Sequence, residues 1–158
     1  MRRAERNMED SEAYRLLREC LWVTLSTVNV REESPLGLGS PYAVPISLVE
    51  HEGQFFFHSA REGHKIDNLR HDRRICINCV GKAELDEKAL SVAYESATFF
   101  AHAEEVTHRD EKKRVLVSLC KRFAPSQEPG TQIEAMVDAT GIWKVHILGC
   151  SGKHRKFE

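Results

Sequence analysis

The chain has 158 residues, of which 23 are Lys or Arg and 24 are Asp or Glu, so its formal net charge is −1. This length fits one domain with a hydrophobic core, and the balanced charge gives no long-range attraction for nucleic acid. The N-terminal residues are charged and lead into no apolar region, and no apolar run approaches the ~20 residues of a membrane span. We therefore expect a single cytoplasmic domain over residues 1–158, with no nucleic-acid partner and no membrane partner.

The first half of the chain predicts one helix followed by strands and turns. The helix opens at Asp10 or Ser11, either of which can cap it, and carries Tyr14, Leu17 and Leu21 at near-helical spacing. The residues after it alternate between apolar and polar types, as in a half-buried strand. The expected elements are then a strand at 21–30, a Pro- and Gly-containing loop at 31–41, a strand at 42–50 and a strand at 54–59, the last two forming a hairpin.

The second half predicts further strands and helices. The expected elements are a short helix within 61–72, a strand at 74–80, a strand at 95–106, a helix opened by a capping box of Thr107 and Asp110, and a strand at 140–148. Residues 81–94 are polar and stay unassigned. Pro45 places its strand at an edge or a bulge, and Trp22 and Trp143 are expected in the core. These elements indicate an α+β protein with a barrel-like sheet.

The five cysteines include a CxxC pair, Cys76 and Cys79, inside a predicted strand. A spacing of three places the two thiols on opposite faces of a strand, whereas a zinc or redox pair converges on a turn. No second CxxC accompanies it. Packing is therefore the favoured interpretation and no metal ligands are predicted, with a metal-dependent protein using this pair kept as the weakest alternative.

The most informative chemistry follows the strand that ends at His58. A turn with Ser59 and Gly63 leads into a helix that begins near Lys65, and helix N-termini bind anions through unpaired backbone N–H groups. Gly63 permits close backbone approach, Lys65 adds a charge, and Asn68 lies one turn further on. These residues suit a phosphate cradle. The alternative is an ordinary helix cap with a solvated lysine.

Several segments resemble, in the same order, the nitroimidazole-reductase-like (Nim-type) proteins of the pyridoxamine 5′-phosphate oxidase-like flavoprotein superfamily. The most specific of them is the pattern from His58 to Arg70, and the resemblance covers most of the chain. The segments are 1–7, 41–49, 55–79, 94–106 and 152–156. The resemblance implies an antiparallel, Greek-key-like split β-barrel with peripheral helices, and a homodimer that holds FMN at its interface.

The resemblance also implies which residues contact the flavin. The backbone of Val44, Pro45 and Ile46 would bind the polar rim of the isoalloxazine ring, and Lys65 would hold the phosphate with Asn68 nearby.

Further contacts are implied around the ring and from other strands. His58, Ser59 and Ala60 would flank the ribityl chain and the ring, Ser96 would approach from another strand, and Lys153 would reach a phosphate or the partner's site. The chain departs from the family pattern at His64, where many relatives have another basic residue, and at Ala101 and His102, where a glycine is expected.

Two classes of function remain open. The first is an FMN-dependent reductase that passes electrons to a nitro compound or another small electrophile, with His58 as the catalytic residue that donates protons or orients the substrate. The second is a non-catalytic flavin- or haem-binding protein of the same superfamily, because a fold does not fix a function. No GxGxxG fingerprint for a dinucleotide is present.

Overall fold

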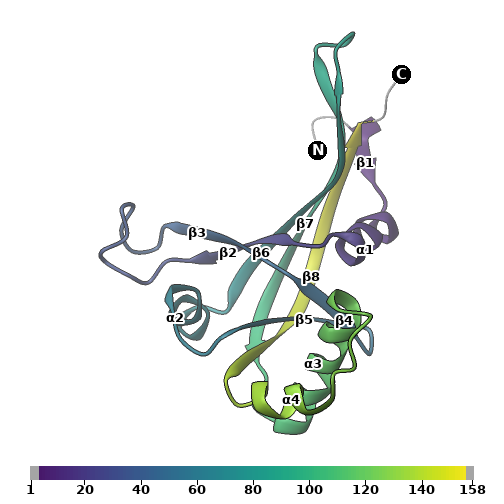
Figure 1. The fold of residues 1–158 in the computed structure, drawn as a ribbon. Coiled ribbons are helices and arrows are strands. Elements are labelled where there is room, and N and C mark those ends of the chain that lie inside the picture. Colours follow the sequence, from purple (N-terminus) through teal and green to yellow (C-terminus); the bar gives the residue numbers. More distant parts are fainter. Residues whose placement is uncertain (1–3, 156–158) are drawn as a thin grey trace.

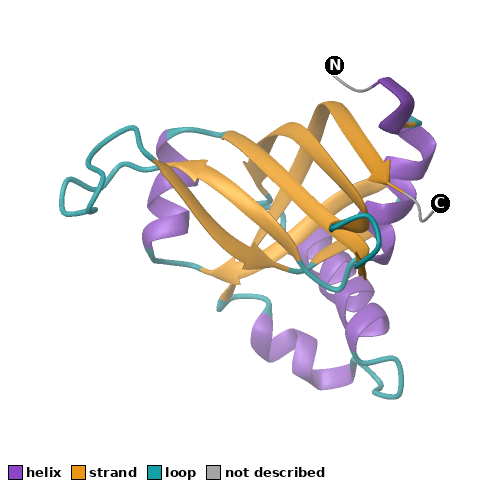
Figure 2. Cartoon of the chain, turned by 90° about the horizontal axis from the view of Figure 1, so that it is seen from above, coloured by secondary structure: helices purple, strands orange, loops and turns teal. Residues whose placement is uncertain are grey.

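The computed structural model describes residues 4–155, which form a strongly curved sheet with helices around its outside (Figures 1 and 2). The elements in chain order are a 3₁₀ turn at Ala4–Arg6, β1 at Asn7–Met8, α1 at Asp10–Glu19, β2 at Val23–Val28, β3 at Pro41–Ile46, β4 at Leu48–His51, β5 at Gln54–Ala60, α2 at His64–His71, β6 at Arg74–Asp86, β7 at Ser91–Glu105, α3 at Arg109–Phe123, α4 at Gly130–Met136 and β8 at Thr140–Arg155. Of the helices in this part of the chain, none has both the length and the apolar character that a membrane crossing needs.

The strands form one antiparallel sheet in the order β3-β2-β6-β7-β8-β5-β4, with β1 paired to β8. The two strands at opposite ends of this order, β3 and β4, are consecutive in the chain and are separated by Ser47 alone. The backbone around Ser47 therefore brings the two ends of the sheet together, which makes the sheet a barrel with a split between β3 and β4. The predicted α+β split-barrel fold with peripheral helices is confirmed.

The single strand predicted at 42–50 is wrong in one respect, because it is two strands that pair with different partners. Thr24 in β2 lies opposite Pro45 in β3, whereas Leu48 in β4 lies opposite Phe57 in β5. Among the described residues β3 pairs with β2 alone, so Pro45 lies on an edge strand, as its missing N–H requires. The hairpin of β4 and β5 is confirmed, and its turn residues Glu52 and Gly53 have positive φ angles of 50° and 73°.

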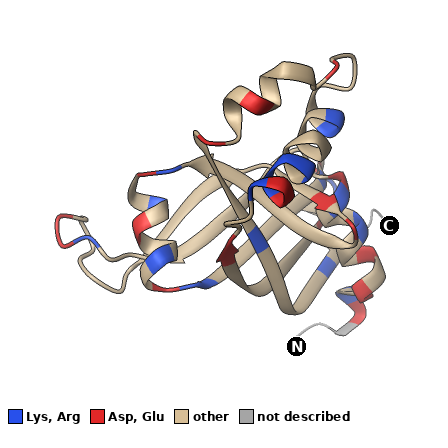
Figure 3. Cartoon of the chain, turned by 90° about the horizontal axis from the view of Figure 1, so that it is seen from below, with Lys and Arg blue, Asp and Glu red and all other residues tan. Residues whose placement is uncertain are grey.

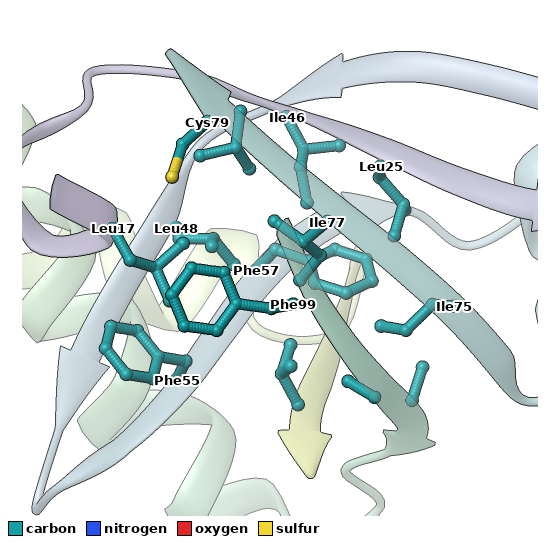
Figure 4. Close-up of a cluster of buried hydrophobic side chains, with 14 of the residues drawn as sticks. Leu17, Leu25, Ile46, Leu48, Phe55, Phe57, Ile75, Ile77, Cys79 and Phe99 are labelled. Atoms are coloured by element: carbon teal, nitrogen blue, oxygen red, sulfur yellow. The ribbon is translucent and has the colours of Figure 1, made fainter. Parts of the chain in front are cut away.

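The barrel interior is packed with apolar side chains from all parts of the sheet (Figure 4). Leu25, Ile77 and Phe99 are fully buried there, and they lie on strands that neighbour each other in the sheet. In β5, Phe57 points into this core, while Phe56 lies on the other face and packs in a second cluster with α3 and α4. These two helices thus cover the outer face of β4 and β5, and the opposite end of β5 is left free to line a site.

Other sequence-based expectations need correction. Glu9 caps α1, and its N–H donates to the Glu12 carboxylate at 3.4 Å, so neither Asp10 nor Ser11 is the cap. Trp22 is 67% exposed, because α1 ends at Glu19 and the chain passes over the surface before β2 begins.

The remaining corrections concern the second half of the chain. Residues 81–94, which stayed unassigned, form the far part of the long β6–β7 hairpin, and α4 lies in a stretch for which no helix was predicted. His108 caps α3 without a side-chain hydrogen bond, so the predicted Thr107–Asp110 capping box is absent. The basic residues up to Arg155 continue β8, where Arg155 donates to Asp86 at 3.2 Å.

Candidate functional site

Two adjoining hollows lie where β3, β5 and the start of α2 meet, and we name them together the β3–α2 cleft. The larger has a volume of about 630 Å³ and is lined by Trp22, Pro45, Ile46, Ser47, His58, Ser59, Ala60 and Lys65. The smaller has a volume of about 220 Å³ and is lined by Tyr42, Val44, Ser59, Ala60, Glu62, Gly63, His64, Lys65 and Ile66. The structure therefore brings together seven of the ten predicted site residues, namely Val44, Pro45, Ile46, His58, Ser59, Ala60 and Lys65.

The N-terminus of α2 opens onto this cleft. Gly63 caps the helix with a φ angle of 122°, a conformation that side chains rarely allow. Its carbonyl accepts from the N–H groups of Ile66 and Asp67 at 2.8 and 3.0 Å. The amides of the first turn before Ile66 have no acceptor within the helix, so they are available to an anion.

Lys65 supplies the positive charge of the cleft. Its side chain is half-buried, and it forms no salt bridge with any carboxylate of the described residues. Burial lowers the pKa of its ammonium group, because water no longer solvates the charged form fully. An unpaired, partly desolvated cation is stabilised by a bound anion, which makes Lys65 the strongest electrostatic feature of the site.

His58 lies on β5 and its ring is accessible from the cleft. Partial burial and, secondly, the charge of Lys65 lower the pKa of its imidazole. At neutral pH the ring is therefore mostly neutral, with one nitrogen able to donate a proton and the other able to accept one.

His64 is held differently. Its Nε2 lies 2.5 Å from Oδ1 of Asn29, and its ring packs against Tyr42 with the centroids 4.1 Å apart. His64, a departure from the family pattern, is thus held in place by Asn29, directly after β2, and by Tyr42 of β3.

The structure does not bring Asn68 to the cleft. Its side chain is completely buried, Oδ1 accepts from the Val30 N–H at 3.0 Å, and Nδ2 donates to the Thr27 hydroxyl at 2.9 Å. Both ends of the amide are engaged, so this residue ties α2 to the end of β2. Lys65 and Asn68 do lie one turn apart on a helix, as the sequence predicted. Their spacing gave no information on the tertiary partners of Asn68.

The side chain of Ser59 is also committed elsewhere. Its hydroxyl donates to the Ala60 carbonyl at 2.7 Å and accepts from Nε1 of Trp143 at 3.1 Å. Gly141 lies so close that an added Cβ would come within 2.8 Å of this oxygen. The hydroxyl of Ser59 therefore makes its contacts in the core, while the residue itself lines the cleft.

Ser96 and Lys153 face each other across β7 and β8. Lys153 also lies opposite Asn7 of β1, at the end of the sheet away from α2 (Figure 1). Neither residue lines the β3–α2 cleft of its own chain.

The backbone edge of β3 completes the cleft. Because β3 pairs with β2 alone among the described strands, the polar groups on its second edge are free where Val44, Pro45 and Ile46 line the hollows. Trp22 stands at the side of the same cleft and was missed as a site residue. The available signal was its position out of phase with the buried alternation of Val23 and Leu25.

A sequence profile described as "Pyridoxamine 5′-phosphate oxidase" matches residues 9–154 of the chain. The chain belongs to this family. Among curated proteins, no sequence matches it.

Solved structures show the same fold. A candidate 5-nitroimidazole antibiotic resistance protein from Bacteroides thetaiotaomicron has 20% identity and a TM-score of 0.76, over 93% of this chain and 85% of that one. Conserved hypothetical protein Rv2991 from Mycobacterium tuberculosis has 20% identity and a TM-score of 0.77, over 97% and 89% of the two chains. An FAD- and haem-binding protein from Mycobacterium smegmatis has 20% identity and a TM-score of 0.73, over 94% and 72%.

The thiols of Cys76 and Cys79 point to opposite faces of β6 and do not converge. Cys79 is 1% exposed in the barrel core, Cys76 lies on the other face of β6, and burial raises the pKa of both. Within residues 4–155 no three His, Cys, Asp or Glu side chains are placed to hold a metal ion.

Proposed function

We propose that this protein binds FMN in the β3–α2 cleft and acts as a reductase that passes electrons to a nitro compound or another small electrophile. The observation that carries the proposal is the half-buried Lys65, which pairs with no carboxylate of residues 4–155, beside the free amides that follow Gly63. This arrangement suits the dianionic phosphate of a flavin mononucleotide.

The remaining lining suits the other parts of FMN. The free edge of β3 at Val44–Ile46 offers backbone polar groups, among them a carbonyl, to the polar rim of the ring, and Pro45 and Ile46 offer apolar surface. When bound, the flavin supplies the electron transfer. His58 holds a proton on one imidazole nitrogen and can pass it to an acceptor in the cleft.

The proposal includes a homodimer, because large apolar side chains lie uncovered on the outer face of β6 and β7. Val80 and Phe100 on this face are 55% and 53% exposed. Ser96 lies opposite Val80 and so faces the same way. In a dimer built on this face, Ser96 and Lys153 of one protomer would serve the cleft of its partner.

The dimer has a direct test. Sedimentation of the flavin-loaded protein should give the mass of two chains. Phe100→Glu should shift the protein to one chain, whereas Phe123→Glu on α3 should leave it dimeric. A stable, flavin-loaded monomer of the unaltered protein would contradict this part of the proposal.

A second candidate is a non-catalytic protein that binds flavin or haem. This candidate is supported by the fold that the chain shares with the FAD- and haem-binding protein from Mycobacterium smegmatis. His58 is the histidine that a haem iron could reach in the cleft, since the ring of His64 is held by Asn29 and Tyr42.

Two measurements separate these functions. An absorbance scan of the purified protein should show the near-ultraviolet and blue bands of a flavin, whereas a Soret band would indicate haem. Anaerobic reduction with NADH or NADPH, followed by addition of a nitroimidazole, should reoxidise the flavin. A flavin that no donor reduces, or that passes nothing to the acceptor, would favour the binding protein.

A further inference from the structure

A separate hollow, outside the β3–α2 cleft, lies between the C-terminal parts of α1 and α3 and the strand β4. It has a volume of about 410 Å³ and is lined by Arg18, Val49, Glu50, Ser118, Lys121 and Arg122. We name it the α1–α3 pocket. Its lining holds three cations and one carboxylate, so it carries a net charge of +2, although the chain as a whole is nearly neutral. Figure 3 shows basic and acidic residues interspersed along the ribbon.

The one carboxylate of the pocket is already neutralised. Both oxygens of Glu50 accept from Arg18, at 2.7 and 3.2 Å. This bond lowers the pKa of Glu50 and keeps it ionised, and Arg18 is held further by the rings of Tyr14 and Phe55, each 5.9 Å away. Lys121 and Arg122 are therefore left without a counter-charge from Glu50.

Arg122 is the unusual member. Its guanidinium is partly buried, and burial lowers its pKa. It donates to the Cys20 carbonyl at 2.8 Å, where it caps the end of α1, and no carboxylate of the described residues lies within salt-bridge distance of it. The cap on α1 uses one of the five N–H donors of Arg122. It does not explain why the positive charge of Arg122 is partly desolvated and lies beside Lys121.

The donors of the pocket lie on one face of α3. Ser118, Lys121 and Arg122 are spaced i, i+3 and i+4, so their side chains neighbour each other on the helix surface. The Ser118 hydroxyl lies 2.9 Å from Nδ1 of His51, and when it accepts from that nitrogen its own proton is free for a ligand.

We propose that the α1–α3 pocket binds a phosphoryl group, either as a free phosphate-class anion or as part of a nucleotide. A guanidinium fork, an ammonium group and a hydroxyl suit the three oxygens of such a group, and a dianion matches the net charge of +2. The pocket shares no lining residue with the β3–α2 cleft, so this site is separate from the one proposed for the flavin phosphate.

Calorimetric titration of the flavin-saturated protein with inorganic pyrophosphate, and separately with ADP, tests the proposal at constant ionic strength. The flavin occupies the Lys65 site, so heat should report the α1–α3 pocket. Lys121→Gln should weaken binding by about tenfold or more, as loss of a charge-assisted hydrogen bond does. Arg114→Gln is the matched control, because Arg114 is an exposed cation on the same helix that does not line the pocket.

Lys121→Gln removes no bond within the described chain, whereas Arg122→Gln also removes the cap on α1. Arg122→Gln is therefore compared only if its thermal midpoint shows that it folds. ADP binding more tightly than pyrophosphate would identify a nucleotide, and equal affinities would identify the phosphoryl group alone. Absence of heat with both probes, or equal weakening by Lys121→Gln and Arg114→Gln, would overturn the proposal. An unchanged FMN affinity in Lys121→Gln would separate this outcome from any failure of the flavin proposal.

Discussion

The ammonium group of Lys65 lies close enough to His58 to lower the pKa of its imidazole, and both side chains line the β3–α2 cleft. The two residues reach it from different elements, His58 from β5 and Lys65 from the first turn of α2. One cleft thus holds a cation that suits a phosphate and a neutral imidazole that suits proton transfer.

Lys65→Ala should weaken FMN binding by roughly tenfold or more, because the phosphate loses a charge-assisted contact. The dissociation constant can be measured by the quenching of flavin fluorescence. Lys88→Ala, at an exposed lysine near the tip of the β6–β7 hairpin, is the control and should bind FMN as the unaltered protein does. Equal affinity in Lys65→Ala would remove this lysine from the site.

The pKa of His58 should rise in flavin-free Lys65→Met, because the charge that helps to lower it is gone. It should stay below the ordinary value, since partial burial is the larger cause. A titration of the imidazole protons by NMR measures both states. A pKa that does not move would show that Lys65 and His58 do not interact.

The lowered pKa of His58 also has a consequence for stability. At a pH below about 6.5 the unfolded chain binds a proton here more readily than the folded chain, so stability should fall as the pH falls through that region. His58→Gln should reduce this slope in urea unfolding measured from neutral pH to pH 5. The same slope in both proteins would assign the pH dependence to other groups.

Asn68→Ala should destabilise the fold by about 1–3 kcal/mol, because the Val30 N–H and the Thr27 hydroxyl lose buried partners. Urea denaturation gives this value. Among molecules that remain folded, FMN affinity should change much less than in Lys65→Ala. A loss of affinity as large as that of Lys65→Ala, without loss of stability, would return Asn68 to the phosphate site.

Trp22→Phe should change the free energy of unfolding by no more than about 0.5 kcal/mol, since the side chain is 67% exposed. Its fluorescence should be quenched when FMN enters the cleft it lines, and the quenching should be largely lost in Trp22→Phe, where Trp143 is the remaining tryptophan. Full quenching in the variant would place the flavin beside Trp143 instead.

The sequence was sufficient where local rules determine the structure. The Glu52–Gly53 hairpin, the α2 start after Gly63 and the buried alternation of Ala97, Phe99, Ala101 and Ala103 all follow from turn chemistry and periodicity. The family resemblance supplied what those rules could not, namely the split of the barrel and the cluster of Val44–Ile46 with His58 and Lys65.

Local rules were not informative where long-range partners decide a residue's contacts. Nothing near Asn68 in the sequence reveals Thr27 or Val30, and nothing near Ser59 reveals Trp143. The break at Ser47 was invisible for the same reason, since it depends on two strands that pair with different neighbours. In the sequence, Arg122 is an ordinary basic residue in the last turn of a helix. Its contact with Cys20, 102 positions away, is known only from the structure.

The break at Ser47 has a further consequence. The free edge that lines the cleft and the seam that closes the barrel are neighbouring parts of one short stretch of backbone, 44–48. A molecule that binds this edge therefore also stabilises the backbone that joins β3 to β4. Amide exchange should slow in β2, β3 and β4, well beyond the residues that the molecule contacts.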